Sequence, residues 1–394
     1  MAPRPPPTPI EIQVISSMKE VQPDRWDALV QPDDPFTEHA FLHALEASGS
    51  VGPGTGWQPV HLLARQGEAL VGAAPLYLKH HSYGEYIFDW GWAEAAQRAG
   101  VAYYPKLTSA VPFTPVTGRR LLTGPGPLNE PVCTALISGM RAVAKTTKAQ
   151  SIHLLFTTEE EHALLVSDPD LIGRVTHQFH WHNADYTDWE DWLGHFRSRR
   201  RKEVRRERRQ ASESGARIRV LPGHALAAED WAALDRFYRD TVQRKWAQAY
   251  LSPDFFSHAR EHLGHRTLIF LADEQGTPVA GALAFQRGRH LFGRYWGCAP
   301  GWERLHFELC YHRPIDYCIE HGLSRFEAGA QGIHKIQRGL MPAHTWSLHQ
   351  VAHPGLARAV REAMVHEGAR IQEEMTLLKR HGPFRRDTTG DGSG

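Results

Sequence analysis

The strongest constraint on the fold of this chain is a pattern of apolar runs and glycine turns that occurs twice. Residues 59–92 read PVHLLARQGEALVGAAPLYLKHHSYGEYIFDWGW, and residues 267–298 read TLIFLADEQGTPVAGALAFQRGRHLFGRYWGC. Each stretch has an apolar run that ends in alanine, a Gln-Gly turn, a second run that begins at a glycine, and an aromatic segment that reaches Trp90 or Trp296. Apolar runs separated by glycine turns predict β-hairpins. We therefore expect two hairpins, each followed by an aromatic strand.

The segments before these hairpins also correspond. Residues 35–49 and 251–264 each predict a short helix that ends at glycine, and Ser252 with Pro253 is a typical helix start. The order helix, strand, turn, strand, strand, helix thus occurs twice, which indicates an internal duplication. A length of 394 residues also suits two domains. We expect an α/β (α+β) protein with these parts: a disordered tail at 1–9, a first domain at 10–172, a second domain at 173–382, and a disordered tail at 383–394.

Three helices are expected outside the repeated pattern. Residues 305–322 are apolar on most of the helix circumference, which predicts a buried helix that Pro314 kinks. Residues 355–380 have apolar side chains at helical spacing and predict an amphipathic C-terminal helix. Thr187 followed by Glu190 is a capping-box pattern, so we expect a helix over 188–212.

The composition is that of a globular protein with reduced cysteines. The four cysteines lie in apolar contexts without CxxC spacing, which favours free thiols and a cytoplasmic location. The first ten residues, MAPRPPPTPI, are proline-rich and do not resemble a signal peptide. No apolar run approaches the roughly 18 residues of a membrane helix.

Several motifs carry a resemblance to a known family. They are PFTPVTGRRLL (112–122), HWHNADYTDWEDWL (180–193), FYRDTVQRKW (237–246), GRYWGC (293–298), LHFELCYHRPIDYCIEHGLSRFEAGAQG (305–332), HKIQRG (334–339) and AHPG (352–355). Over roughly residues 35–375 the chain resembles an uncharacterised bacterial FemAB-like family of the GNAT N-acyltransferase superfamily, which is often labelled as related to peptidoglycan biosynthesis. The resemblance implies two tandem GNAT-like domains, each with a mixed, mostly antiparallel sheet flanked by helices. The family has an acidic residue where Ile333 stands, so a catalytic carboxylate is not expected at that position.

The densest polar cluster is GAQGIHKIQRG at 329–339. Its glycines allow a ligand to approach the backbone closely. We expect Gln331 and Arg338 to bind substrate, and His334 and Lys335 to take part in catalysis, His334 as an acid or base. A polar surface loop with solvated charges is the alternative interpretation.

The aromatic strand and the start of the next helix supply further candidates. GNAT folds line the acyl pocket with this strand, so the resemblance implies that Tyr295 and Trp296 lie there, Tyr295 with a catalytic role and Trp296 binding substrate. We also expect Arg294 of this strand and His306 at the start of the next helix to bind substrate, and His306 is a candidate for proton transfer. Core packing explains Tyr295 and Trp296 equally well. Glu308 lies in an apolar helix, where a carboxyl group must be paired or protonated, and it is our favoured candidate for proton transfer.

One helix segment concentrates the positive charge of the chain. Residues 197–209 contain nine basic and two acidic residues, a local charge of +7 in a chain of net charge +1. Arginine binds phosphate bidentately. A solvated helix face is the alternative, but we expect an anionic partner, which under the FemAB resemblance would be the acceptor stem of a tRNA. The expected anion-binding residues are Arg199, Arg200, Arg201, Lys202, Arg205 and Arg206.

Three functions remain open from the sequence. The first is an N-acyltransferase that moves an aminoacyl group from aminoacyl-tRNA to an amine on a cell-envelope precursor, as the resemblance implies. The second is an acyl-CoA-dependent N-acetyltransferase with a divergent pyrophosphate loop. The segment RLLTGPG (120–126), which we compare with the usual [QR]xxGx[GA] loop, is one residue too long, and its proline removes a backbone donor. The third is a non-catalytic module that binds nucleic acid or another polyanion. We expect no metal site and no required cofactor beyond the acyl donor.

Overall fold

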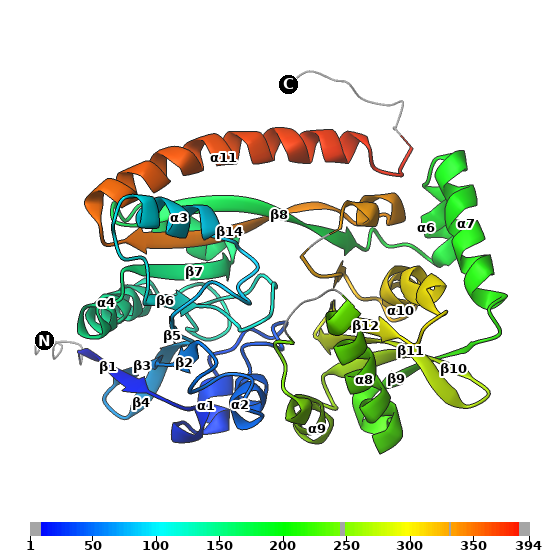
Figure 1. Cartoon of the computed structure of the whole chain (residues 1–394), viewed down its shortest axis with the longest axis horizontal. Coiled ribbons are helices and arrows are strands. Elements are labelled where there is room, and N and C mark those ends of the chain that lie inside the picture. Colours follow the sequence, from blue (N-terminus) through cyan, green and yellow to red (C-terminus); the bar gives the residue numbers. More distant parts are fainter. Residues whose placement is uncertain (1–8, 245–248, 331, 386–394) are drawn as a thin grey trace, which may run out of the picture. The chain divides into compact units, whose positions relative to one another are not determined.

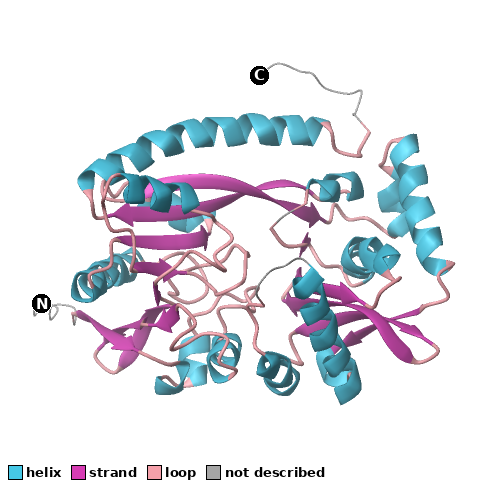
Figure 2. Cartoon of the chain, in the orientation of Figure 1, coloured by secondary structure: helices cyan, strands magenta, loops and turns pink. Residues whose placement is uncertain are grey.

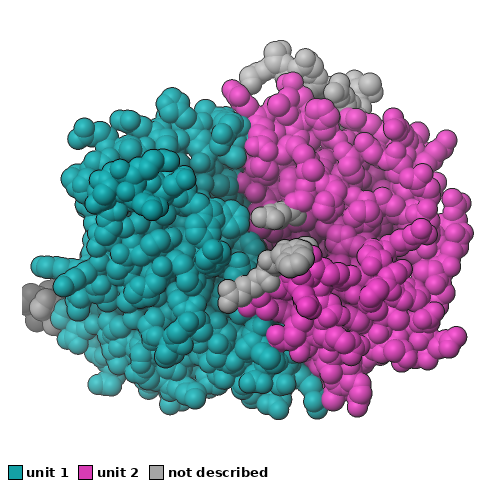
Figure 3. Space-filling model, viewed as in Figure 1, with its two compact units in different colours: residues 1–176, 250–263, 344–371 teal, residues 177–249, 264–343, 372–394 magenta. Residues whose placement is uncertain are grey.

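The computed structural model describes residues 9–244, 249–330 and 332–385 (Figure 1). The chain forms two compact units, each assembled from separate stretches of sequence (Figure 3). The first unit comprises residues 1–176, 250–263 and 344–371, and the second comprises residues 177–249, 264–343 and 372–394. The domains expected from the sequence, 10–172 and 173–382, are contiguous ranges, because a repeat pattern follows chain order whereas packing does not.

The first unit contains two sheets. Three antiparallel strands form the smaller sheet in the order β1 (Ile10–Ile15), β3 (His61–Gln66) and β4 (Ala69–Ala74). The strands of the second follow one another as β2 (Trp57–Pro59), β5 (Tyr77–Lys79), β6 (Lys106–Ser109), β7 (Ser151–Thr157) and β14 (Met341–Val351). Only the pair β6–β7 is parallel among these neighbours, and α4 (Glu130–Thr147) is its crossover helix.

Other helices complete the first unit. They are α1 (Pro23–Asp27), α2 (His39–Ala47), α3 (Trp90–Arg98), α5 (Glu159–Leu165), α9 (Pro253–His262) and most of α11 (Pro354–Arg380). The core between α4 and the strands consists of aliphatic side chains such as Leu62, Leu107, Leu136 and Leu154. The expected helices at 35–49, 251–264 and 355–380 are therefore present as α2, α9 and α11.

The second unit contains one mixed sheet (Figure 2). Its strands follow one another as β8 (Ile172–His182, which begins in the first unit), β13 (Arg325–Glu327), β12 (His290–Cys298), β11 (Thr277–Arg287), β10 (Thr267–Glu274) and β9 (Arg217–Pro222). The pair β12–β13 is parallel and the other pairs are antiparallel. Its helices are α6 (Trp189–Gly194), α7 (Ser198–Ser212), α8 (Ala228–Arg244) and α10 (Arg313–Glu320).

The two units share the repeated pattern that the sequence predicts. Each has a hairpin, β3–β4 or β10–β11, and in each the register shifts directly after the matching alanine, Ala64 or Ala272. Each also has a parallel pair joined by a helix, β6–α4–β7 in the first unit and β12–α10–β13 in the second. A bulge at the same place in both hairpins supports an internal duplication, because bulges are retained as specific features of a fold.

One strand of the repeat was assigned wrongly. Trp90 and Gly91 were expected in an aromatic strand, but they begin helix α3. Helix α3 lies in residues 80–105, a segment between β5 and β6, whereas β11 and β12 are joined by a tight turn at Gly288. The counterpart of β12 is therefore β6, which pairs with β5 as β12 pairs with β11.

The expected helix over 188–212 is two helices, α6 and α7, and its cap differs from the prediction. Asp188, and not Thr187, caps α6, because its side chain accepts a hydrogen bond from the backbone N–H of Asp191. The helix breaks at 195–197, where the N–H of Arg197 donates to the carbonyl of Pro383. Phe196 is fully buried there against Trp192 and Phe384. Residues 383–385 are thus part of the packed second unit, while 386–394 and 1–8 lie outside the described residues.

The expected helix over 305–322 is also interrupted. A π-turn spans Glu308–His312, directly before α10, and Pro314 lies in the first turn of α10. Proline has no N–H to donate to an α-helical partner, so a change of helix type before it is its expected effect. The kink predicted at Pro314 thus takes the form of a wider helical turn, which sets the direction of the side chains of residues 308–312.

Candidate active site

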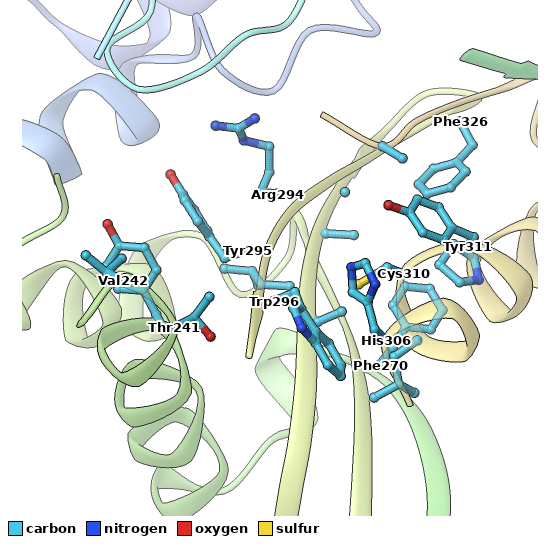
Figure 4. A pocket seen from close by; sticks show the side chains of 18 residues that line it. Thr241, Val242, Phe270, Arg294, Tyr295, Trp296, His306, Cys310, Tyr311 and Phe326 are labelled. Carbon is cyan, nitrogen blue, oxygen red and sulfur yellow. The ribbon is translucent and has the colours of Figure 1, made fainter. Parts of the chain in front are cut away.

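A cavity lies where two parallel strands of the second unit separate. Strands β12 and β13 pair only between His290–Phe292 and Arg325–Glu327. Beyond Phe292, β12 continues to Cys298 while β13 ends. The cavity at this place has a volume of about 330 Å³ and is lined by 18 residues (Figure 4). A volume of this size is typical of small-molecule sites.

The cavity is lined from both faces of the sheet. Side chains alternate along a strand, so Ala282 and Ala284 of β11 share one face, and both belong to the core cluster that includes Leu309 of the π-turn. The opposite face carries Tyr295, whose ring packs edge-on against Tyr238 of α8. Figure 4 shows Tyr295 on the side of Thr241 and Val242 of α8, and Trp296 next to His306. Groups that enter from the two faces can therefore meet at the gap between β12 and β13.

A β-bulge shapes the edge of the cavity. The register of β11 against β12 changes from Leu283–Tyr295 to Ala284–Gly293, which leaves Arg294 as the extra residue. Bulges re-aim side chains and are frequent beside active sites. Four candidates from this strand and the next helix, Arg294, Tyr295, Trp296 and His306, all line the cavity.

A tyrosine that sequence analysis missed brings His334 to the cavity. Tyr311 lies in the π-turn and lines the cavity, and its hydroxyl is 2.9 Å from Nε2 of His334. Burial raises the pKa of Tyr311, so its hydroxyl stays protonated near neutral pH. Burial and the nearby cations of Arg338 and Lys335 lower the pKa of His334, which is therefore neutral and can accept the proton of Tyr311. The direction of Tyr311 depends on the π-turn, for which the sequence offered no signal beyond Pro314.

Lys335 is buried beneath this pair. It is only 2 % exposed, and its amino group donates a hydrogen bond to the carbonyl of Gly329 at 2.6 Å. Burial lowers the pKa of Lys335 to about 7, and the positive charge of Arg294 acts in the same direction. Lys335 is not among the described residues that line the cavity.

Glu308 points away from the cavity. Its carboxylate lies 3.2 Å from Arg208 of α7, and its Oε2 atom is buried without a hydrogen-bond partner among the described residues. The cavity is lined by its neighbours Leu309, Cys310 and Tyr311, and not by Glu308 itself. Of the two alternatives expected for this carboxyl group, paired or protonated, the structure shows pairing, and the partner is an arginine of the basic segment.

Arg338 is held in a network with α7. It makes two hydrogen bonds to Glu207, at 3.1 and 2.6 Å, and its guanidinium lies 3.3 Å from the centre of the Phe307 ring. His312 contacts the same carboxylate at 2.9 Å. Glu207 therefore connects three segments of the second unit, and Arg338 serves this connection. Gln331, the other expected substrate-binding residue of this loop, lies outside the described residues, and Ile333 is exposed.

The basic segment is partly neutralised by nearby carboxylates. Arg199 and Arg200 pair with Glu203, and Arg205 pairs with Glu190. Arg201 donates a hydrogen bond to the carbonyl of Gly194. A shallow concavity on this face is lined by Lys202, Glu203, Arg205, Arg206 and Arg209. Within the described ranges, Lys202 and Arg206 pair with no carboxylate, so they give this concavity its uncompensated positive charge.

A glycine-loop match that sequence analysis overlooked lies in this region. Residues Arg294 to Ala299 fit the spacing [QR]xxGx[GA]. However, Arg294–Cys298 belong to strand β12, and the helical turn that follows carries Glu303 at its start. A pyrophosphate is bound by backbone N–H groups at a helix N-terminus, so the match does not form such a loop here.

Among the described residues, buried side chains pack together at the corresponding place in the first unit. Ala110 follows β6, and it packs with Leu155 and Phe156 of β7 and with Ile87 of the segment 80–105. Nearby, the buried Lys106 of β6 pairs with Glu85 and Asp89, which also come from that segment. Side chains from residues 80–105 thus occupy the end of the parallel pair that is open in the second unit.

Comparisons with known proteins identify the class and then the family. The fold is that of tandem GNAT-type proteins. A solved structure described as FemX is 12% identical, with a TM-score of 0.52, and the alignment covers 89% of this chain and 100% of that chain. A conserved protein of unknown function from Bacteroides thetaiotaomicron is 8% identical, with a TM-score of 0.52, over 86% of this chain and 100% of that chain. A tandem GNAT protein from the clavulanic acid biosynthesis pathway is 12% identical, with a TM-score of 0.42, over 88% of this chain and 99% of that chain.

The family is shown by the sequence itself. Residues 17–386 match the model of the FemAB-like family, described as peptidoglycan biosynthesis/recognition, and the chain belongs to this family. No curated protein sequence matches the chain. Family and fold together make this a FemAB-like protein, of a family described as peptidoglycan biosynthesis/recognition, with the fold of FemX. Among the described residues, no helix has the length and apolar character needed to cross a membrane.

Proposed function

We propose that the chain is an N-acyltransferase whose transfer step takes place in the cavity between β12 and β13. The observation that carries this proposal is the separation of the two parallel strands beyond Phe292, with a cavity lined from both sheet faces. An acyl donor at one face and an amine at the other would meet at this gap. Holding two reactants together in this way is a large part of catalysis of group transfer.

The Tyr311–His334 pair supplies the proton transfer that the reaction needs. The amine nitrogen attacks the acyl carbonyl, a C–N bond forms, and the bond from the carbonyl carbon to the leaving oxygen or sulfur breaks. The amine loses one proton, and the leaving group gains one. Tyr311, 2.9 Å from the neutral His334, can pass the amine proton to His334 and return it to the leaving group, so the proton balance closes.

The donor we propose is aminoacyl-tRNA, and the acceptor an amine of a peptidoglycan precursor. The family description and the resemblance of the motifs support this choice. The basic concavity around Lys202 and Arg206 supports it too, because Lys and Arg bind nucleic-acid phosphates. Aminoacyl-tRNA is a cytoplasmic compound, so we propose that the reaction occurs in the cytoplasm.

An acyl-CoA donor is the second candidate, favoured by the position of the cavity at the end of β12, where GNAT folds line the acyl pocket. It would need a way to bind pyrophosphate other than the usual loop. A module that binds polyanions without catalysis would explain the basic concavity but not the cavity.

A transfer assay tests the proposal. The purified protein is mixed with aminoacyl-tRNA charged with a labelled amino acid and with a soluble peptidoglycan precursor peptide, and label in the peptide is measured. We expect transfer that falls at least tenfold in Tyr311→Phe. Transfer from acyl-CoA and not from aminoacyl-tRNA would mean that acyl-CoA is the donor. Transfer from neither compound, with tRNA binding retained, would favour a binding module without catalysis.

A further inference from the structure

The cavity of the second unit has a floor of small residues and walls of large apolar ones. The floor consists of Ala282 and Ala284 of β11, Gly293 of β12 and Ala328 after β13. The walls include Phe270, Trp296, Leu309, Pro314 and Phe326. Small side chains at the floor leave space that the aromatic and aliphatic walls do not fill. Because interiors are close-packed, unfilled apolar space in a core indicates a place for an apolar ligand group.

The cavity is poorly suited to a positively charged group. Among the described residues that line it there is no carboxylate, and the charged side chain there is the cation Arg294. A cationic ligand group would therefore be buried beside Arg294 without a carboxylate partner from these residues, which is strongly unfavourable.

We infer that the acyl group transferred by this protein is a large, apolar one without a positive charge, which lies on Ala282 and Ala284 under Trp296 and Leu309. This inference rests on the proposed function and names the class of its acyl substrate. For an aminoacyl donor, the side chain would be of the leucine or phenylalanine type. A two-carbon acyl group or a glycyl group would leave most of the space between Ala282, Ala284 and the apolar walls unfilled.

Binding of carrier-free analogues tests this without knowledge of the donor. Unreactive amides of N-acetylcysteamine, in which NH replaces the thioester sulfur, are prepared with acetyl, hexanoyl, 3-phenylpropanoyl and 6-aminohexanoyl groups. Their affinities are measured by calorimetry. Each buried methylene contributes about 0.8 kcal/mol, so the hexanoyl and phenylpropanoyl amides should bind roughly 100-fold tighter than the acetyl amide. The 6-aminohexanoyl amide matches hexanoyl in length and should bind at least tenfold more weakly than hexanoyl because of its charge.

Substitutions of the floor make the test specific to this cavity. Ala284→Gly enlarges the cavity next to position 284, whereas Ala284→Val and Ala284→Leu reduce it in two steps. Thermal unfolding shows whether each variant is folded. Affinity for the hexanoyl amide should be retained in Ala284→Gly and fall stepwise by tenfold or more to Ala284→Leu. If Ala284→Leu does not fold, the comparison is made with Ala284→Val, which introduces a smaller side chain.

The outcomes separate this inference from the proposed function. Equal binding of the acetyl and hexanoyl amides, equal binding of the charged and uncharged six-carbon amides, or an affinity unaffected by Ala284→Val would overturn the inference. None of these results affects the transfer assay, in which acyl transfer from a small aminoacyl donor would still establish an N-acyltransferase. Conversely, selective binding of large acyl amides without any acyl transfer would sink the proposed function and leave an apolar binding site.

Discussion

The hydroxyl of Tyr311 lies 2.9 Å from Nε2 of His334, at the wall of the cavity between β12 and β13. Tyr311 comes from the π-turn before α10, and His334 comes from the short helical segment Ile333–Arg338. The two side chains are thus held together by segments that are far apart in sequence. This pair gives the first prediction.

Tyr311→Phe should lower kcat for acyl transfer about 100-fold with little change in KM, because it removes proton transfer and retains the ring. In the wild type, burial and nearby cations lower the pKa of His334, so the rate should stay constant from pH 7.5 down to the ordinary histidine value and fall only below it. The measurement is a pH profile of kcat. A Tyr311→Phe variant with wild-type kcat would exclude this pair from the chemistry.

Lys335 should make the stability of the second unit rise with pH. Burial lowers its folded-state pKa to about 7 from an ordinary value of 10.5, so between these values the unfolded chain binds more protons. The free energy of unfolding should therefore increase by about 2 kcal/mol from pH 7 to pH 9, and not below pH 7 through this group. Urea unfolding of Lys335→Met should lack this increase, whereas Lys379→Met, at an exposed site, should keep it. If the free energy of unfolding rises with pH equally in Lys335→Met and Lys379→Met, Lys335 is not buried in its neutral form.

Glu207 should be the more sensitive to substitution of the two acidic residues of α7, Glu203 and Glu207. It accepts hydrogen bonds from Arg338 and contacts His312, so Glu207→Gln leaves a buried guanidinium without its partner. We expect a loss of roughly 2–4 kcal/mol in the free energy of unfolding. Glu203→Gln on the same helix is the matched control, and its pairs with exposed arginines should contribute less than about 1 kcal/mol. Similar losses in both variants would mean that Glu207 does not connect these segments.

The basic concavity should determine the salt dependence of RNA binding. Lys202→Gln combined with Arg206→Gln should weaken tRNA binding and reduce the slope of log K against log salt by about 2. The control pair is Arg358→Gln with Lys379→Gln, two exposed basic residues of α11. Filter binding across a range of salt concentrations measures both. If the control pair reduces the slope as much as the α7 pair, RNA does not bind through the concavity.

Much of the architecture follows from local sequence patterns. The hairpins, the helices α2, α9 and α11, and the repeat all depend on short-range features such as Gln-Gly turns and apolar spacing, which neighbouring residues determine. Trp90 was placed in a strand because an aromatic segment has no clear period of its own. The structure shows that a segment inserted between β5 and β6 interrupts the repeat there.

The residues that line the cavity could be expected from the sequence where they lie on a regular strand. They could not be expected where their direction depends on packing between distant segments. Arg294, Tyr295 and Trp296 line the cavity because β12 extends beyond its partner, which the resemblance to acyltransferases implied. Tyr311 was missed and Glu308 was favoured because a regular helix was assumed, whereas a π-turn and Arg208 set their directions. The break between α6 and α7 depends on Pro383 and Phe384, which are distant in sequence.

The filled end of the parallel pair in the first unit has a consequence for stoichiometry. Ile87 packs against Ala110, Leu155 and Phe156 at the place that corresponds to the open cavity of the second unit. The two repeats therefore differ in the number of acyl groups that they can bind, because in the first repeat side chains of the chain itself occupy the place that is open to a ligand in the second. A chain of this kind should bind one equivalent of acyl donor at saturation, although it contains two repeats from an internal duplication.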